Sequence, residues 1–149
     1  MGLIFSTVID ILTLGLEEEE TPEPADRKYW ENKSSKEIVH MADEILGFTT
    51  TFIEGYVLKF NKSYIGVAKD GISRNFISFY PQRSTIILNV KHPQNDEMDE
   101  LISKSDIEAL SYDRQWNNYR FRISNSIDLE RNKKALINIM NKAYQYYVS

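Results

Sequence analysis

The amino-acid sequence predicts an α+β fold, in which an antiparallel sheet of about five strands has helices packed on one face. The first observation is that apolar residues recur at helical intervals over 38–45 and 129–147. The second is that they alternate with other residues over 56–91 and 119–123. The connections between the central strands are too short for crossovers, so we expect neighbouring strands to be antiparallel.

Residues 1–16 form an apolar leader segment, and residues 17–33 form an acidic linker and entry that contains prolines. The leader is shorter than the roughly 20 apolar residues that a spanning helix needs, so no membrane span is expected. Glutamates 17–20 and the prolines after them disfavour both helix and sheet. A single α+β domain is predicted over residues 34–149. The absence of cysteine excludes disulfides and suits the cytoplasm, the expected location.

The first core helix is expected to begin at Ser34, which has capping-box spacing to Glu37, and to end at Gly47. After it the hydrophobic period falls to two, which is typical of strands. Four short strands are predicted in this region, at 56–60, 64–68, 75–80 and 85–91. Turn residues separate them, so the four strands are expected to form a meander.

Helical spacing returns at 97–104, and Ser105 with Glu108 predicts the cap of a further short helix. The segment 119–123 alternates strictly between large apolar residues and two arginines, which predicts a fifth strand with both arginines on one face. Asp128 is expected to begin the final helix, whose apolar stripe would pack against the sheet.

No familiar catalytic pattern is recognisable. Asn89 and Lys91 have the strand spacing of a restriction-type nuclease, but an amide stands where magnesium requires a carboxylate. His40 and His92 belong to no metal-binding motif, and no glycine-rich loop opens a helix. We therefore predict neither a metal nor a cofactor. Whether the chain is an enzyme stays open, and the missing constellation favours a non-catalytic role.

Positive charge gathers on the predicted sheet. Residues 56–92 carry six basic side chains against one acid, whereas residues 1–33 have a net charge of −5 and the rest of the chain +1. Arginines mix with aromatic rings near the fifth strand, a combination that suits phosphates and unstacked bases. The predicted nucleic-acid-binding residues are Lys59, Lys62, Arg83, Lys91, Trp116, Arg120 and Arg122. The alternative is that these cations protect exposed strand edges and pair with acids of the helices.

Six segments carry a resemblance to a known family: DRKYWENKSS, KFNKSYIGVAKDG, NFISFYPQRS, LSYDRQW, YRFRIS and NIMNKAYQYY. Over about residues 26–147 the chain resembles a bacterial domain of unknown function that is often labelled a predicted transport protein and is found with restriction-endonuclease-like segments. The resemblance implies an α+β domain without an established activity, so it supplies no catalytic residue. The positions that match its pattern are Trp30, Lys62, Tyr64, Phe76, Pro81, Trp116, Tyr119 and Arg120.

Two functions from different classes are compatible with these observations. The first is a non-catalytic, nucleic-acid-associated module of a defence or DNA-processing system. The second is a protein-interaction or self-association module that uses the apolar residues 1–16. A hydrolase with a degenerate motif ranks third, because it would need a site that the spacing of the residues does not reveal.

Overall fold

The computed structural model describes residues 25–149, so the predictions about the apolar leader and the glutamate tract lie outside the described residues. The described part has an α+β fold with five α-helices and an antiparallel sheet of seven strands. The helices are α2 (Arg27–Lys33), α3 (Lys36–Phe48), α4 (Asp96–Ser103), α5 (Ser126–Arg131) and α6 (Lys133–Val148), with a short 3-10 helix, η1 (Thr49–Thr51), after α3.

The strands are β3 (Tyr56–Phe60), β4 (Ile65–Lys69), β5 (Ile72–Ser73), β6 (Ile77–Pro81), β7 (Ile86–Lys91), β8 (Glu108–Ala109) and β9 (Asn118–Ile123). Their order in the sheet is β3-β4-β6-β7-β9-β8, and β5 pairs with β4. Every pairing is antiparallel, which confirms the predicted class. The five predicted strands are present, and β5 and β8 are two-residue additions that are too short for an alternation to reveal.

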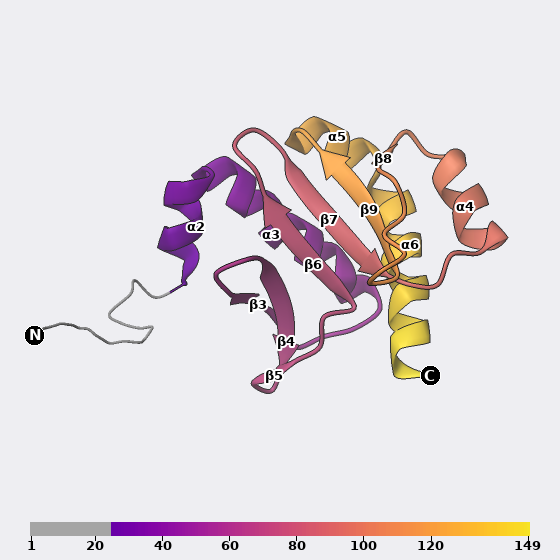
Figure 1. The fold of residues 1–149 in the computed structure, drawn as a ribbon, viewed down its shortest axis with the longest axis horizontal. Helices are drawn as coiled ribbons and strands as arrows, with labels where there is room; N and C mark the ends of the chain where they lie inside the picture. The colour runs from indigo at the N-terminus through magenta and orange to yellow at the C-terminus, as the bar shows by residue number, and fades with distance from the viewer. Residues whose placement is uncertain (1–24) are drawn as a thin grey trace, which may run out of the picture.

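The helices α3 and α6 cover one face of the sheet and lie behind it in Figure 1. Large apolar side chains of the central strands point toward these helices and form the core with them. On β6, β7 and β9 these residues are Ile77, Phe79, Ile86, Leu88, Val90, Tyr119, Phe121 and Ile123. The alternate positions of the same strands lie on the opposite side, which we call the open face and which is turned toward the viewer in Figure 1.

Helix α2 belongs to the folded part, although residue 34 was predicted as the start of the domain. Trp30 is only 3% exposed, and its indole Nε1 donates a hydrogen bond to the Asn61 carbonyl at 2.8 Å. Arg27 forms two hydrogen bonds with the Asp43 carboxylate of α3, at 2.9 and 2.7 Å. A seven-residue polar helix with one buried ring has too short an apolar stripe to be recognised from its period.

The cap of α3 is shifted by one residue from its predicted position. The Ser35 hydroxyl, and not that of Ser34, accepts a hydrogen bond from the Ile38 N–H, at 3.1 Å. Ser34 instead ends α2, and its own N–H donates to the Trp30 carbonyl. The short preceding helix therefore decides which of two adjacent serines is the cap. The spacing alone could not make that choice.

Two further predictions for the second half of the chain are wrong in detail. Ser105 ends a turn after α4 and does not cap a helix, because Glu108 and Ala109 pair with β9 as strand β8. The final helix does not begin at Asp128. Asn125 caps α5 by accepting a hydrogen bond from the Asp128 N–H, α5 ends at Arg131, and α6 begins at Lys133. The continuous apolar stripe therefore belongs to α6 alone.

An irregular joint connects β4 to β6. The two strands pair through Ile65 and Phe79, and the Val67 N–H donates to the Asn75 side-chain Oδ1 at 2.9 Å. The Asn75 side chain lies over Gly66, where a Cβ atom would be only 2.3 Å from Oδ1. Glycine is needed here because Asn75 approaches the strand so closely. A side-chain amide thus takes a role that a backbone carbonyl usually has in a sheet.

Tyr119 fixes α4 to the sheet. Its ring is buried, its hydroxyl donates to the Asp99 Oδ1 at 2.9 Å, and the Asn95 N–H donates to the same hydroxyl at 3.0 Å. Burial above all, together with the Asp99 carboxylate, raises the pKa of Tyr119 to about 12. The neutral phenol is therefore the form that the folded protein favours.

We expect the stability that depends on Tyr119 to disappear at alkaline pH. The unfolded chain ionises near its ordinary pKa of about 10, so this contribution is complete below that pH and is lost as the pH rises toward 12. Tyr119→Phe should lower the free energy of unfolding by about 1 to 2 kcal/mol at neutral pH. Urea unfolding of both proteins should show a smaller difference in the free energy of unfolding at pH 11 than at pH 8. An equal difference at both pH values would contradict the proposed protonation linkage.

Candidate functional site

Three adjacent hollows on the open face form what we call the sheet groove. Their volumes are about 390, 270 and 240 Å³, and Tyr80 of β6 lines all three. Strands β6 and β7 supply Ser78 and Asn89 to the largest hollow, and the turn before β9 supplies Asp113 and Trp116. The groove exists because the alternate positions of the sheet are polar or aromatic here and no helix covers them.

Two tyrosines form an ordered aromatic surface in the groove. The rings of Tyr64 and Tyr80 stack with their centroids 5.9 Å apart and their planes 30° apart. The Asn75 amide, which also accepts from Val67, donates to the Tyr64 hydroxyl at 3.3 Å. Burial raises the pKa of the Tyr80 phenol, so the groove favours its neutral form.

Trp116 is held in an exposed position by the turn between β8 and β9. The Asp113 carboxylate accepts hydrogen bonds from the Gln115 and Trp116 N–H groups, at 3.0 and 3.3 Å. Asn117 has a φ of 58°, in the left-handed region, which asparagine tolerates better than most residues. Lys91 donates to the Trp116 carbonyl at 2.9 Å. The indole is 61% exposed although its backbone is fixed at several points.

Asn89 is the least expected residue of the groove. It is 7% exposed, and it lines the two largest hollows. Among residues 25–149, its Oδ1 is the one buried side-chain polar atom without a hydrogen-bond partner. A buried acceptor without a donor costs about 1 to 3 kcal/mol of stability. Few buried polar atoms of folded proteins lack a partner in this way.

The groove brings together three of the seven residues predicted to bind nucleic acid. Lys91, Trp116 and Arg120 line the two largest hollows. Arg120 is paired across the strands with Asn89 and takes part in none of the ion pairs within residues 25–149. Arg83 lies at the far end of the groove, where it lines the third hollow with Lys33.

The other three predicted residues lie away from this cluster. Arg122 is on the open face, but it forms an ion pair with Glu108 of β8 at 2.7 Å. Lys59 of β3 donates to the Ser73 hydroxyl at 2.7 Å, and Lys62 lies in the exposed turn between β3 and β4. The alternative interpretation is met only in part. Arg122 is paired with an acid, but that acid belongs to strand β8 and not to a helix, and Lys59 lies on the edge strand β3. Arg120 has no ion-pair partner among the described residues.

Sequence reasoning missed the uncharged residues of the groove and its one acid, Asp113. Tyr64, Asn75, Ser78, Tyr80 and Asp113 line it, and none of them was predicted as a site residue. The alternation of β6 does place Ser78 and Tyr80 opposite the core, so their common face was a readable signal. The Asn89 Oδ1 lacks a partner because of the way β7 is placed between β6 and β9. No local sequence pattern contains that information.

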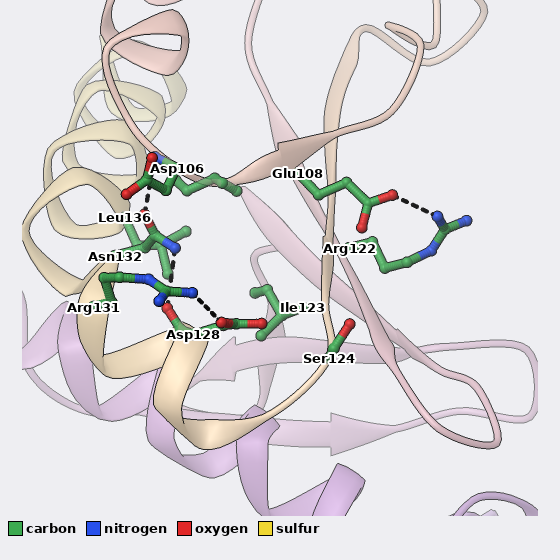
Figure 2. Close-up of a pocket in the computed structure, with 10 residues that line it drawn as sticks. Asp106, Glu108, Arg122, Ile123, Ser124, Asp128, Arg131, Asn132 and Leu136 are labelled. Atoms are coloured by element: carbon green, nitrogen blue, oxygen red, sulfur yellow. Dashed lines mark hydrogen bonds and ion pairs between the residues drawn. The ribbon is translucent and has the colours of Figure 1, made fainter.

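A separate hollow of about 80 Å³ lies between the β8–β9 edge and helices α5 and α6. Figure 2 shows that its charged side chains are directed at one another, with Arg131 on Asp128 and Arg122 on Glu108. Asn132 closes it further by accepting from the Asp106 N–H at 3.2 Å. We interpret this hollow as a contact region that holds the helices against the sheet, because four of its charged side chains, Glu108, Arg122, Asp128 and Arg131, are already engaged in ion pairs.

The chain was compared with family models, curated proteins and solved structures. None of them matches it. The family that the six sequence segments suggest therefore stays a prediction. Within residues 25–149 no helix has both the length and the apolar character needed to cross a membrane. In the same range no three histidine, aspartate or glutamate side chains are grouped as metal ligands would be.

Proposed function

We propose that the open face of the sheet binds single-stranded nucleic acid in a non-catalytic role. The observation that carries this proposal is the position of Trp116, an exposed indole on a fixed turn, beside Lys91 and Arg120 in one groove. Exposed rings on a rigid sheet stack on unpaired bases, while neighbouring cations attract the phosphates. Both parts of such an interface are present at the sheet groove.

The charge of the described residues also fits this proposal. Residues 25–149 contain all 18 lysines and arginines of the chain and 16 of its 22 acids, a net charge of +2. A charge this small suits a few phosphate contacts combined with stacking, and it does not suit a surface that wraps duplex DNA. The stacked Tyr64 and Tyr80 support the same choice, because stacking requires bases that are not paired in a helix.

The biological setting is part of the proposal. The segments quoted above resemble a bacterial domain found with restriction-endonuclease-like segments, which supports a role in defence or DNA processing in the cytoplasm. In that setting a module without its own catalytic group would hold a nucleic-acid strand for a partner enzyme that acts on that strand. The pair Asn89 and Lys91 supports no nuclease step, because an amide at position 89 cannot replace a carboxylate ligand of magnesium.

We expect a labelled single-stranded oligonucleotide of mixed sequence to bind the full chain, and to bind more weakly as salt rises from about 50 to about 200 mM. Arg120→Gln should remove about one phosphate contact and reduce the salt slope by about 0.7. Fluorescence anisotropy measures both effects. The matched control is Lys134→Gln, which removes an exposed cation from α6 and should change neither. Undetectable binding at low salt, or binding indifferent to salt, would rule the proposal out.

A further inference from the structure

We propose that the smallest hollow of the sheet groove, which we call the end hollow, binds the terminal phosphate of the bound strand. This inference rests on the proposed function, and it adds recognition of a strand end, which stacking on Trp116 and attraction to Arg120 do not supply. The end hollow has a volume of about 240 Å³, and Lys33, Ser63 and Arg83 are among the residues that line it.

Three segments that are distant in the sequence meet at the end hollow. Lys33 is the last residue of α2, Ser63 lies in the turn between β3 and β4, and Arg83 lies in the turn between β6 and β7. All three side chains are exposed, so a ligand can reach them from solvent. Ammonium, hydroxyl and guanidinium groups all donate hydrogen bonds, and phosphate oxygens accept them.

Two hydrogen bonds attach α2 to the β3–β4 turn. The Trp30 Nε1 donates to the Asn61 carbonyl at 2.8 Å, and the Tyr29 hydroxyl donates to the Lys62 carbonyl at 3.4 Å. The turn that carries Ser63 is therefore held against the helix that carries Lys33.

The end of α2 is also attached to the β6–β7 turn. The Ser34 hydroxyl, directly after the helix, donates to the Gln82 carbonyl, which directly precedes Arg83. The Lys33 Nζ lies 5.1 Å from the centroid of the Trp30 ring, a contact that restrains the ammonium beside the hollow. The three segments are thus positioned by contacts that do not use the donors facing a ligand.

The charge of the end hollow suits a terminal phosphate. Lys33 and Arg83 line it, and none of its lining residues is an aspartate or glutamate. Neither cation takes part in an ion pair within residues 25–149. A terminal phosphate carries about 1.5 to 2 negative charges at neutral pH, whereas a phosphate inside a strand carries about one. Two cations without an acid therefore match the terminal group better.

The position of this hollow in the groove supports the same assignment. Tyr80 lines all three hollows, so the end hollow continues the surface proposed to hold the strand. Helix α2 contributes Trp30 and Lys33 to the end hollow and lines neither of the other two. Helix α2 therefore stands at one end of the groove, where a strand that follows β6 would stop.

The test compares three short thymine oligonucleotides of equal length, labelled at an internal position, that carry a 5′ phosphate, a 3′ phosphate or no terminal phosphate. We expect the full chain to bind at least one phosphorylated strand about fivefold more tightly than the unphosphorylated strand in fluorescence anisotropy. The preferred end identifies the direction of the strand. Arg83→Gln should reduce this preference to less than about twofold and leave affinity for the unphosphorylated strand within about twofold of the wild type.

The matched control is Arg74→Gln, which removes an exposed arginine that lines none of the three hollows. It changes the net charge equally and should keep the preference, and urea unfolding verifies that both variants are folded.

The outcomes separate the two proposals. If the wild type binds all three strands equally, if Arg83→Gln keeps the preference, or if both variants lose it alike, the terminal-phosphate site is wrong and the proposed function stands. If the wild type binds none of the strands at low salt, the proposed function fails and this inference fails with it.

Discussion

Trp30→Ala is expected to lower the free energy of unfolding by about 3 to 5 kcal/mol, the range measured for large aromatic residues in cores. The indole is 3% exposed and belongs to the hydrophobic core, and its Nε1 hydrogen bond to the Asn61 carbonyl would also be lost. That carbonyl lies in the turn between β3 and β4, so the variant would detach α2 from the sheet as well as leave a cavity.

Urea unfolding followed by circular dichroism measures this effect. The control is the other tryptophan of the chain. Trp116→Ala removes a ring that is 61% exposed, and it should change the free energy of unfolding by less than about 0.5 kcal/mol. Equal stabilities for the wild type and Trp30→Ala would mean that α2 does not belong to the cooperative unit.

The largest expected effect on binding comes from the same Trp116→Ala variant. A base stacked on an aromatic side chain contributes about 1 to 3 kcal/mol, so the affinity for a single-stranded oligonucleotide should fall about 5-fold to 150-fold. The turn is fixed by Asp113 and Lys91 through backbone groups of residues 115 and 116, which alanine retains. The loss would therefore be one of stacking and not of turn geometry.

Anisotropy titration of the wild type, Trp116→Ala and Trp116→Phe separates stacking from other causes. Phenylalanine keeps a π face and should retain most of the affinity. The salt slope should be the same for all three proteins, because no charge changes. If Trp116→Ala binds as tightly as the wild type, the interface does not include the Trp116 ring.

The strands were predictable because alternation is a local signal. Val90, Leu88 and Ile86 face the core, and Asn89 and Lys91 face away, as a period of two requires. The strand β8 was missed for the opposite reason. The spacing of Ser105 and Glu108 is typical of a helix cap, and only the pairing with β9 makes Glu108 and Ala109 a strand. Short elements of this kind depend on partners that are distant in the chain.

The candidate site was predictable in its cations and not in its acid or its neutral groups. Lys91 and Arg120 lie on the face that alternation assigns them, so their presence together could be inferred from two strands of the sequence. The turn that fixes Trp116 depends on Lys91, which is 25 residues earlier. The Asn89 Oδ1 has no partner because no residue near it on β6 or β9 donates a hydrogen bond to it. Only the folded sheet contains that information.

The amide of Asn75 has a wider consequence for the architecture. Because it stands in for a main-chain acceptor between β4 and β6, the β3–β4 hairpin is attached to β6 by a single strand pair, Ile65 with Phe79, and by the hydrogen bond from the Val67 N–H to the Asn75 side chain. The same amide holds Tyr64, which stacks on Tyr80 of β6. The distance between the Tyr64 and Tyr80 rings therefore depends on Asn75 and on Gly66, the strand residue beneath Asn75 that has no side chain.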